Sequence, residues 1–370
     1  MHSVAVPTPV QDLLIRAALE GPVDGGEYLD LWAERVEFDD IDHASRRLLP
    51  LLYHTHGADL RHPDAGRIKG VYKRAWMRNQ RIKAATRTVI DDLEALGIDT
   101  VILKGLSLVE RAYFDLGARS MSDADLLVHP DAFWDAEAHL RTSGWTIKGR
   151  ERDHASHPQF HGIGFTNDEG LECDLHWSVY NVYGFEEGED DLLAACVPIQ
   201  GYGERTTALS SADELLHVMV HGLQWNAFPP IRWIPDAVLL LRNPQASIDW
   251  DRLISQAVER RLTLPAAFGL DLATSYGAVV PREVVEGLNA IPVGATERYE
   301  WWARQQSIFG LRLPTDYIRS TRSDARSPTP AGLYQFYQSI YPETTLQESA
   351  VRFGRAARKL AKKRPYVTDA

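Results

Sequence analysis

The sequence predicts an α+β fold, because its helical and strand patterns occupy separate parts of the chain. Apolar residues recur at helical spacing from residue 10 to about residue 97, and again from residue 210 onward. The convincing strand patterns fall between residues 98 and 205, interrupted by one helical segment over residues 131–142. We therefore expect N-terminal helices over residues 1–97, a sheet-containing core over residues 98–205 and a helical C-terminal domain over residues 206–370.

The N-terminal helices include residues 66–96, which have the pattern of one or two long amphipathic helices rich in Lys and Arg. We expect this region to pack against the core. The chain of 370 residues, 44% apolar and 25% charged, has the composition of a soluble globular protein with two or three domains. Prolines divide the C-terminal part into short helices, and the run RSPTP at residues 326–330 is typical of an exposed linker.

The core is expected to begin with a buried strand over residues 99–103, a turn at Lys104 and Gly105, and a helix over residues 106–114. Gly105 lets the backbone approach an anion, and the N-terminus of a helix favours negative charge. Lys104 and Ser107 add side-chain donors, so the segment suits a phosphate group. A glycine that ends a strand is also an ordinary turn, and the Lys-Gly pair alone does not decide between the two.

Two carboxylates, Asp123 and Asp125, stand two residues apart just ahead of an apolar run. In an extended strand both project to the same side, while Ala124 faces the other. Two like charges on one face need a compensating partner, and Mg²⁺ is the usual one, since it binds carboxylates, water and substrate phosphates. The pair therefore suggests phosphate chemistry. The alternative is an Asp N-cap followed by a solvated Asp at the start of a strand.

Residues 170–177 alternate cleanly, with apolar side chains on one face and Glu172, Asp174 and His176 on the other. If this strand pairs beside the one that follows Asp123, Asp174 supplies a third carboxylate, either as a metal ligand or as the base that accepts a proton. Glu172 is the competing candidate. His176 shares the face of Asp174 and either orients it, contacts substrate or forms hydrogen bonds within the sheet. The plain alternative is a surface strand with a polar outer face.

These segments together resemble one known family. The matching residues are Leu103-Lys104-Gly105, the run RSMSDADLLV at residues 119–128 and the run DLHW at residues 174–177. The similarity continues through ELLH at residues 214–217, His221 and RWIPD at residues 232–236. The combination resembles the uncharacterised nucleotidyltransferase family within the polymerase-beta-like superfamily, over residues 90 to 290 or so.

The resemblance implies a small mixed sheet flanked by helices, in which Asp123 and Asp125 hold Mg²⁺ or Mn²⁺ against a nucleoside triphosphate. Asp174 matches the third acidic position. The implied reaction transfers a nucleoside monophosphate to an acceptor, which is a small molecule, a protein or an RNA, and releases pyrophosphate. Such a transfer depends on positioning and charge neutralisation and needs no protein nucleophile.

The phosphate contacts depart from the superfamily pattern. Its usual Gly-Ser after the first strand is Lys104-Gly105 here, and the nearest serine is Ser107. Arg119, four residues before Asp123, can reach a phosphate oxygen through its planar guanidinium or form a surface salt bridge. We expect Lys104, Gly105, Ser107 and Arg119 to contact the nucleotide.

Histidines form a cluster at His154, His157 and His161, on an expected loop and strand edge. Their spacing fits no closed zinc pattern with the two distant cysteines, so they either line the acceptor side of the cleft or belong to a solvated loop. His217 and His221 fall four residues apart on an expected helix, but the glutamate of a metalloprotease motif is missing. We expect these two to be core or interface histidines.

Arg232 and Asp236 are likewise four residues apart on the next expected helix. This spacing suits an intrahelical ion pair, and the family resemblance adds the alternative that both brace the cleft.

The chain has only two cysteines, no long uninterrupted apolar stretch and no basic, apolar leader at its start. We therefore expect a cytoplasmic protein without a membrane span. The net charge of −11 disfavours broad, nonspecific binding of nucleic acid by the whole molecule. Residues 351–364 are locally basic, and a helix there would contact RNA, an anionic membrane or an acidic partner, or would simply be solvated.

Three functions compete at this level. The first is an active, Mg²⁺-dependent nucleotidyltransferase that uses Asp123, Asp125 and Asp174. The second is a catalytically inactive module that binds nucleotide for regulation. The third is a toxin-like enzyme that modifies tRNA, for which the basic segment over residues 351–364 is the sole sequence support.

Overall fold

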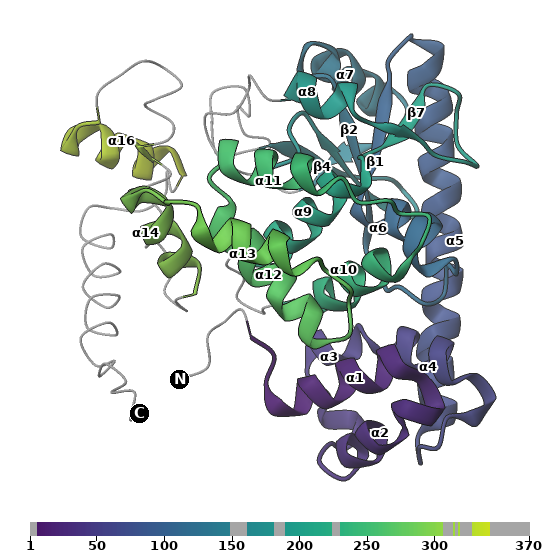
Figure 1. The fold of residues 1–370 in the computed structure, drawn as a ribbon. Coiled ribbons are helices and arrows are strands. Elements are labelled where there is room, and N and C mark those ends of the chain that lie inside the picture. The colour runs from purple at the N-terminus through teal and green to yellow at the C-terminus, as the bar shows by residue number, and fades with distance from the viewer. Residues whose placement is uncertain are drawn as a thin grey trace.

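The computed structural model describes residues 6–148, 161–180, 189–223 and 230–305, together with residues 314, 317–318 and 328–340. A mixed sheet carries helices on both faces, which confirms the expected α+β class (Figure 1). The basic segment over residues 351–364 lies outside the described residues. Among the helices that the structure describes, none is long and apolar enough to cross a membrane.

Seven strands of the described residues form one sheet, in the order β3-β4-β5-β2-β1-β7-β6. Their bounds are β1 Thr100–Leu103, β2 Asp123–Val128, β3 Thr146–Ile147, β4 Gly162–Thr166, β5 Glu172–His176, β6 Val197–Pro198 and β7 Thr206–Ala208. Strand β1 is antiparallel to β2 and parallel to β7, while β2 is parallel to β5, so the sheet is mixed as expected. Strand β7 extends the sheet to Ala208, three residues past the expected core limit at residue 205.

One face of the sheet packs against α5 (Ala65–Ala95) and α7 (Phe133–Thr142). Helix α5 is a single helix of 31 residues, and its buried stripe includes Ile82, Val89 and Leu93. These side chains meet the strand residues whose side chains point to the same face, such as Leu126. The long amphipathic pattern over residues 66–96 therefore corresponds to one helix that supports the sheet.

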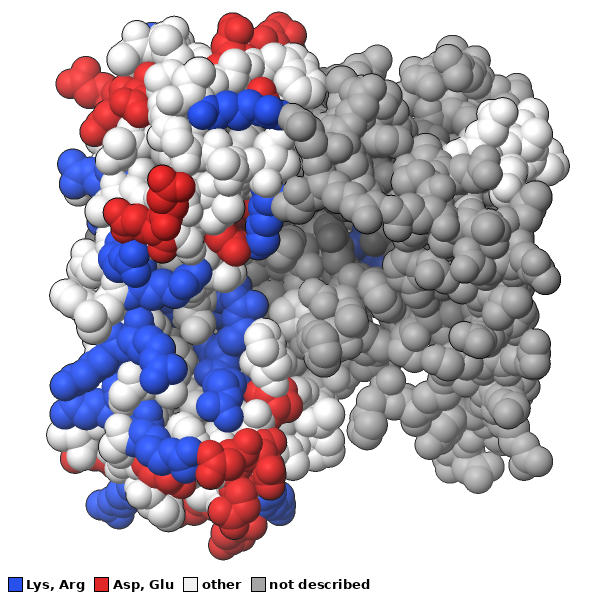
Figure 2. All heavy atoms as spheres, turned by 180° about the vertical axis from the view of Figure 1, so that it is seen from behind, with Lys and Arg blue, Asp and Glu red and all other residues white. Residues whose placement is uncertain are grey.

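The outward face of α5 is strongly basic. Residues 65–90 contain eight Lys or Arg and no Asp or Glu, although the whole chain is acidic. Figure 2 shows the blue side chains gathered over this part of the molecule. The exposed members are Arg67, Lys69, Lys73, Arg74, Arg78, Arg81 and Arg87.

The opposite face of the sheet contributes to a second hydrophobic core, which helices from both ends of the chain share. The helices of this core are α1 (Pro9–Asp24), α2 (Gly26–Ala33), α3 (His43–Arg46), α4 (Leu49–His56), α9 (Ser211–Gly222), α10 (Trp233–Arg242), α11 (Trp250–Glu259), α12 (Thr263–Ser275) and α13 (Arg282–Ala290). The sheet contributes Val101 and Leu127 to this core. Helix α10 also contacts α1 through Arg242, whose Nη2 lies 2.7 Å from Glu20 Oε1. The N-terminal and C-terminal helices therefore pack on each other.

Shorter elements complete the described chain. They are α6 (Lys104–Leu108), α8 (Glu189–Ala194), α14 (Ala295–Arg304), α16 (Pro330–Ile340), the 3₁₀ turns Phe38–Asp40, Gly57–Asp59 and Pro130–Ala132, and the π-helix η3 (Val109–Tyr113). The expected helix over residues 106–114 is thus a five-residue α-helix, α6, continued by a π-helical turn. It ends at Phe114, whose φ of 54° is left-handed and stops the helix.

The turn after β1 also differs in detail from the expectation. The left-handed residue is Lys104, with φ of 44°, and not Gly105. Gly105 instead allows the Met121 side chain to approach closely, because a Cβ at this position would stand 2.7 Å from Met121 Sδ. A left-handed residue that bears a side chain is uncommon, and this one lies at the edge of the candidate site.

Candidate active site

The pairing of β2 with β5 brings the predicted acidic residues together. The two strands are parallel, with Asp125 opposite Asp174 and Asp123 opposite Glu172. Because neighbouring residues in register project to the same side, Asp123, Asp125 and Asp174 share one face of the sheet. The expectation that these two strands pair is confirmed. Their pairing depends on the path of the chain between them, which no local sequence pattern specifies.

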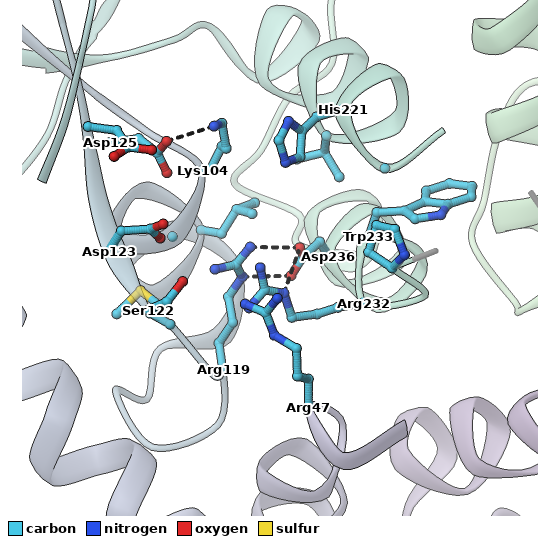
Figure 3. A pocket seen from close by; sticks show the side chains of 17 residues that line it. Arg47, Lys104, Arg119, Ser122, Asp123, Asp125, His221, Arg232, Trp233 and Asp236 are labelled. Carbon is cyan, nitrogen blue, oxygen red and sulfur yellow. Dashed lines mark hydrogen bonds and ion pairs between the residues drawn. The ribbon is translucent and has the colours of Figure 1, made fainter. Parts of the chain in front are cut away.

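The three carboxylates open into one pocket with a volume of about 200 Å³ (Figure 3). Its lining consists of Arg47, Lys104, Gly105, Leu108, Arg119, Met121, Ser122, Asp123, Asp125, Asp174, Val218, His221, Gly222, Pro230, Arg232, Trp233 and Asp236. Helices α9 and α10 provide the wall opposite the sheet. Gly222 permits this closure, since a Cβ there would stand 2.1 Å from the Trp233 ring.

Asp125 is the most tightly held of the acidic residues. It is 7% exposed, and its Oδ1 accepts hydrogen bonds from Lys104 Nζ at 2.7 Å and from His176 Nε2 at 3.0 Å. Burial alone would raise the pKa of Asp125, but the Lys104 ammonium and the His176 hydrogen bond hold that pKa well below its usual value. His176 therefore orients Asp125, where the sequence suggested Asp174.

The pKa of Asp174 is shifted in the opposite direction from that of Asp125. Burial, followed by the negative charges of Asp125 and Asp123, raises the pKa of Asp174 to about 6. Candidate ligand atoms of Asp125, Asp174 and His176 all lie within 4.8 Å of one another. Carboxylate oxygens at this separation fit a divalent cation, which would favour the charged form of both aspartates.

The other residues of the β5 face have different roles. Glu172, the competing carboxylate, does not line the pocket, because its Oε2 pairs with Lys148 Nζ at 2.6 Å. His161 lies beside His176, with 5.0 Å between the ring centroids. His154 and His157 fall outside the described residues.

The two histidines of α9 behave differently from each other. His217 is 2% exposed and packs in the core against Tyr180, as expected for a core histidine. His221 instead opens into the pocket, where it lies near Lys104 (Figure 3). The Lys104 ammonium, followed by desolvation, lowers the pKa of His221 to about 3, so the ring is neutral. No local sequence pattern distinguishes His221 from His217.

The predicted phosphate contacts are only partly in the pocket. Lys104, Gly105 and Arg119 line it, whereas Ser107 does not. Ser107 is fully buried on α6, because its side chain points into the protein interior. The Lys-Gly turn thus presents one side chain, Lys104, and that side chain is bound to Asp125.

Arg119 is buried, so the alternative of a surface salt bridge does not hold. It is 4% exposed, and its Nε and Nη2 each donate to Asp236 at 2.8 Å. The Tyr113 hydroxyl donates to the same carboxylate at 2.7 Å. Arg232, the expected intrahelical partner of Asp236, is farther away, with Nε 4.0 Å from Oδ2. Burial alone would raise the pKa of Asp236, but the positive charge of Arg119 and its hydrogen bonds hold that pKa below its usual value.

The loop that carries Arg119 is fixed by its backbone. Asn79, fully buried on α5, donates through Nδ2 to the carbonyls of Leu116 at 2.5 Å and Arg119 at 2.7 Å. Arg78 Nη2 donates to the carbonyl of Ser122 at 2.7 Å, and Arg232 Nη1 donates to that of Ser120. Helices α5 and α10 therefore hold the loop from two sides, directly before Asp123.

Arg47 is a pocket residue that the sequence did not reveal. It follows α3, lies half-buried and faces the site from the N-terminal helices (Figure 3). No motif surrounds it, and it is 76 residues from Asp123 along the chain. Only the shared core of the N-terminal and C-terminal helices brings it to the pocket.

A family model described as "uncharacterised nucleotidyltransferase" matches residues 43–277, which is more than half of the chain. The chain belongs to this family of uncharacterised nucleotidyltransferases. The matched segment includes every residue that lines the pocket, from Arg47 to Asp236. No curated protein sequence matches the chain.

Proposed function

We propose that the protein is a divalent-cation-dependent nucleotidyltransferase, which moves a nucleoside monophosphate from a nucleoside triphosphate to an acceptor and releases pyrophosphate. The meeting of Asp123, Asp125 and Asp174 in one pocket carries this proposal. The same pocket holds four cationic side chains, so it suits a polyanionic substrate. Family membership supports the same reaction class.

Asp123, Asp125 and Asp174 would hold Mg²⁺ or Mn²⁺, since these ions prefer oxygen ligands. His176 would then support Asp125 through its hydrogen bond of 3.0 Å. When bound, the cation supplies charge neutralisation for the phosphates and fixes their orientation.

The side chains of the protein do the remaining work. An acceptor hydroxyl or amine forms a bond to the α-phosphorus, and the bond from that phosphorus to the β-phosphate oxygen breaks, so pyrophosphate leaves. Asp174 accepts the proton of the acceptor, a role that suits a carboxyl group whose pKa is raised to about 6 by burial and by the charges of Asp125 and Asp123. No covalent intermediate with the protein is required.

One observation favours the second candidate, an inactive nucleotide-binding module. Lys104 Nζ already stands 2.7 Å from Asp125 Oδ1, where its charge competes with a metal ion. An active enzyme must let Lys104 turn from Asp125 toward a phosphate, whereas an inactive module can keep the pair. The tRNA-modifying alternative rests on residues 351–364, which lie outside the described part of the chain.

The position of a ³²P label in the nucleoside triphosphate distinguishes transfer of the nucleoside monophosphate from binding alone. The protein is incubated with Mg²⁺ and a metabolite, protein and RNA extract, once with α-³²P-labelled and once with γ-³²P-labelled nucleoside triphosphates. We expect label to enter an acceptor from the α-position and to appear as pyrophosphate from the γ-position. Acceptor labelling from the γ-position would indicate a kinase, and no labelling from either would favour the inactive module.

A further inference from the structure

The pocket contains four cationic side chains and four carboxylates, but two of the cations have no carboxylate within hydrogen-bond distance among the described residues. Lys104 pairs with Asp125 at 2.7 Å, and Arg119 binds Asp236 through two hydrogen bonds of 2.8 Å. Arg232 is 4.0 Å from Asp236, which Arg119 already occupies.

Arg47 is the second of these cations. Among the residues that the structure describes, no carboxylate lies within ion-pair distance of Arg47. If a divalent cation takes Asp123 and Asp174, no carboxylate remains in the pocket to balance Arg47 and Arg232.

Three guanidiniums converge on one carboxylate at this end of the pocket. Arg47, Arg119 and Arg232 come from distant parts of the chain and reach toward Asp236, beside Asp123 (Figure 3). This crowding of positive charges is unfavourable. Burial, followed by the charges of Arg119 and Arg47, lowers the pKa of Arg232 to about 9. A buried excess of positive charge is stabilised when an anion binds to it.

The turn after β1 offers such an anion one side-chain donor, Lys104, and only after Lys104 turns away from Asp125. Ser107 is fully buried outside the pocket, and the ammonium of Lys104 is bound to Asp125. The arginines are better suited, because a planar guanidinium donates two parallel hydrogen bonds to phosphate. Asp236 accepts hydrogen bonds from Nε and Nη2 of Arg119 but not from its Nη1. Nη1 lies beside Gly105, where a Cβ would be 3.3 Å from it.

We propose that Arg47, Arg119 and Arg232 form an anion subsite that binds the two terminal phosphates of the nucleoside triphosphate and holds pyrophosphate as it leaves. This inference rests on the proposed function. It assigns the two terminal phosphates to the arginine end of the pocket, while the carboxylate end holds the divalent cation. Asp236 is a positioning residue, since it orients Arg119. The subsite also joins the N-terminal helices, the core and the C-terminal helices, so a bound triphosphate ties the three together.

The test is calorimetric titration of inorganic pyrophosphate into the full-length protein, with a chelator present to remove metal ions. We expect wild-type protein to bind, and Arg47→Gln and Arg232→Gln each to bind about tenfold more weakly or worse, because each loses a hydrogen-bonded charge. Arg46→Gln is the matched control, since it removes the same charge one residue away from Arg47, on an exposed side chain outside the pocket. Arg47→Lys, which keeps the charge without the planar fork, should bind with intermediate affinity.

Several results would overturn the subsite: no binding of pyrophosphate to wild type, unchanged binding by both glutamine variants, or equal weakening by Arg46→Gln. If Arg232→Gln does not fold, Arg47→Gln decides alone, because its side chain is half-buried and has no ion-pair partner among the described residues. A variant with Asp123→Ala and Asp125→Asn separates this inference from the proposed function. It should keep metal-free pyrophosphate binding while it loses metal-dependent nucleotide binding, and either property can fail without the other.

Discussion

Asp123→Ala is expected to lower nucleotide transfer by at least about 10³-fold, which corresponds to roughly 4 kcal/mol of transition-state stabilisation. The reason is the loss of a carboxylate from the proposed metal site, at the start of β2. The fold should survive, because Asp123 is only partly buried and no hydrogen bond to its side chain is seen among the described residues. The measurement is the rate of α-³²P incorporation into acceptor under saturating Mg²⁺.

Asp125 needs a gentler change for the same test. Its carboxylate is buried with Lys104 and His176, so Asp125→Ala would leave a buried ammonium without its partner. Asp125→Asn keeps the shape and should reduce transfer by a similar factor. Glu172→Gln is the matched control, since this carboxylate lies on the same face but pairs with Lys148 outside the pocket. Full activity in Asp123→Ala or Asp125→Asn would contradict the metal-site assignment.

Asp236→Asn is expected to lower the free energy of unfolding by about 3–5 kcal/mol at neutral pH, the usual cost of breaking a buried ion pair. Arg119, 4% exposed, would then be buried without an opposing charge. Glu286→Gln provides the comparison, because its pair with Arg282 is exposed on α13 and such pairs contribute about 0–1 kcal/mol. Urea unfolding of both variants measures the difference, and equal losses would show that the buried pair is not structural.

The effect of Asp236→Asn should also depend on pH. The pKa of Asp236 is lower in the folded protein than its usual value of 3.8, so the unfolded chain binds its proton more readily. The stability due to this carboxylate is therefore complete above about pH 4 and is lost as the pH falls through the folded-state pKa. The gap in unfolding free energy between wild type and Asp236→Asn should shrink in acid. A constant gap down to about pH 3 would contradict the assigned shift.

Local patterns were sufficient for the elements that carry the acidic residues. Period-two alternation placed Asp174 on the open face of its strand, and the two-residue spacing placed Asp123 and Asp125 on one side of β2. Helical periodicity likewise predicted α5 nearly to its ends. These features depend on residues close in sequence, and their physical causes are local.

The partners of these residues depend on packing between distant segments. Arg119 and Asp236 are 117 residues apart, so their spacing along the chain carries no signal of contact. Arg47 reaches the pocket because the N-terminal helices share a core with α9 and α10. Ser107 was predicted to face a phosphate, but α6 turns its side chain into the core, and the direction of a side chain on so short a helix follows from tertiary packing.

We expect this pocket to bind a nucleoside triphosphate through a divalent cation. Calorimetric titration of each nucleoside triphosphate, with and without Mg²⁺, tests this most directly when wild type is compared with the double variant Asp123→Ala/Asp125→Asn. We expect Mg²⁺-dependent binding of at least one triphosphate to wild type and its loss in the double variant. Binding that is independent of Mg²⁺ and equal in the two proteins, or no binding of any triphosphate, would contradict the claim.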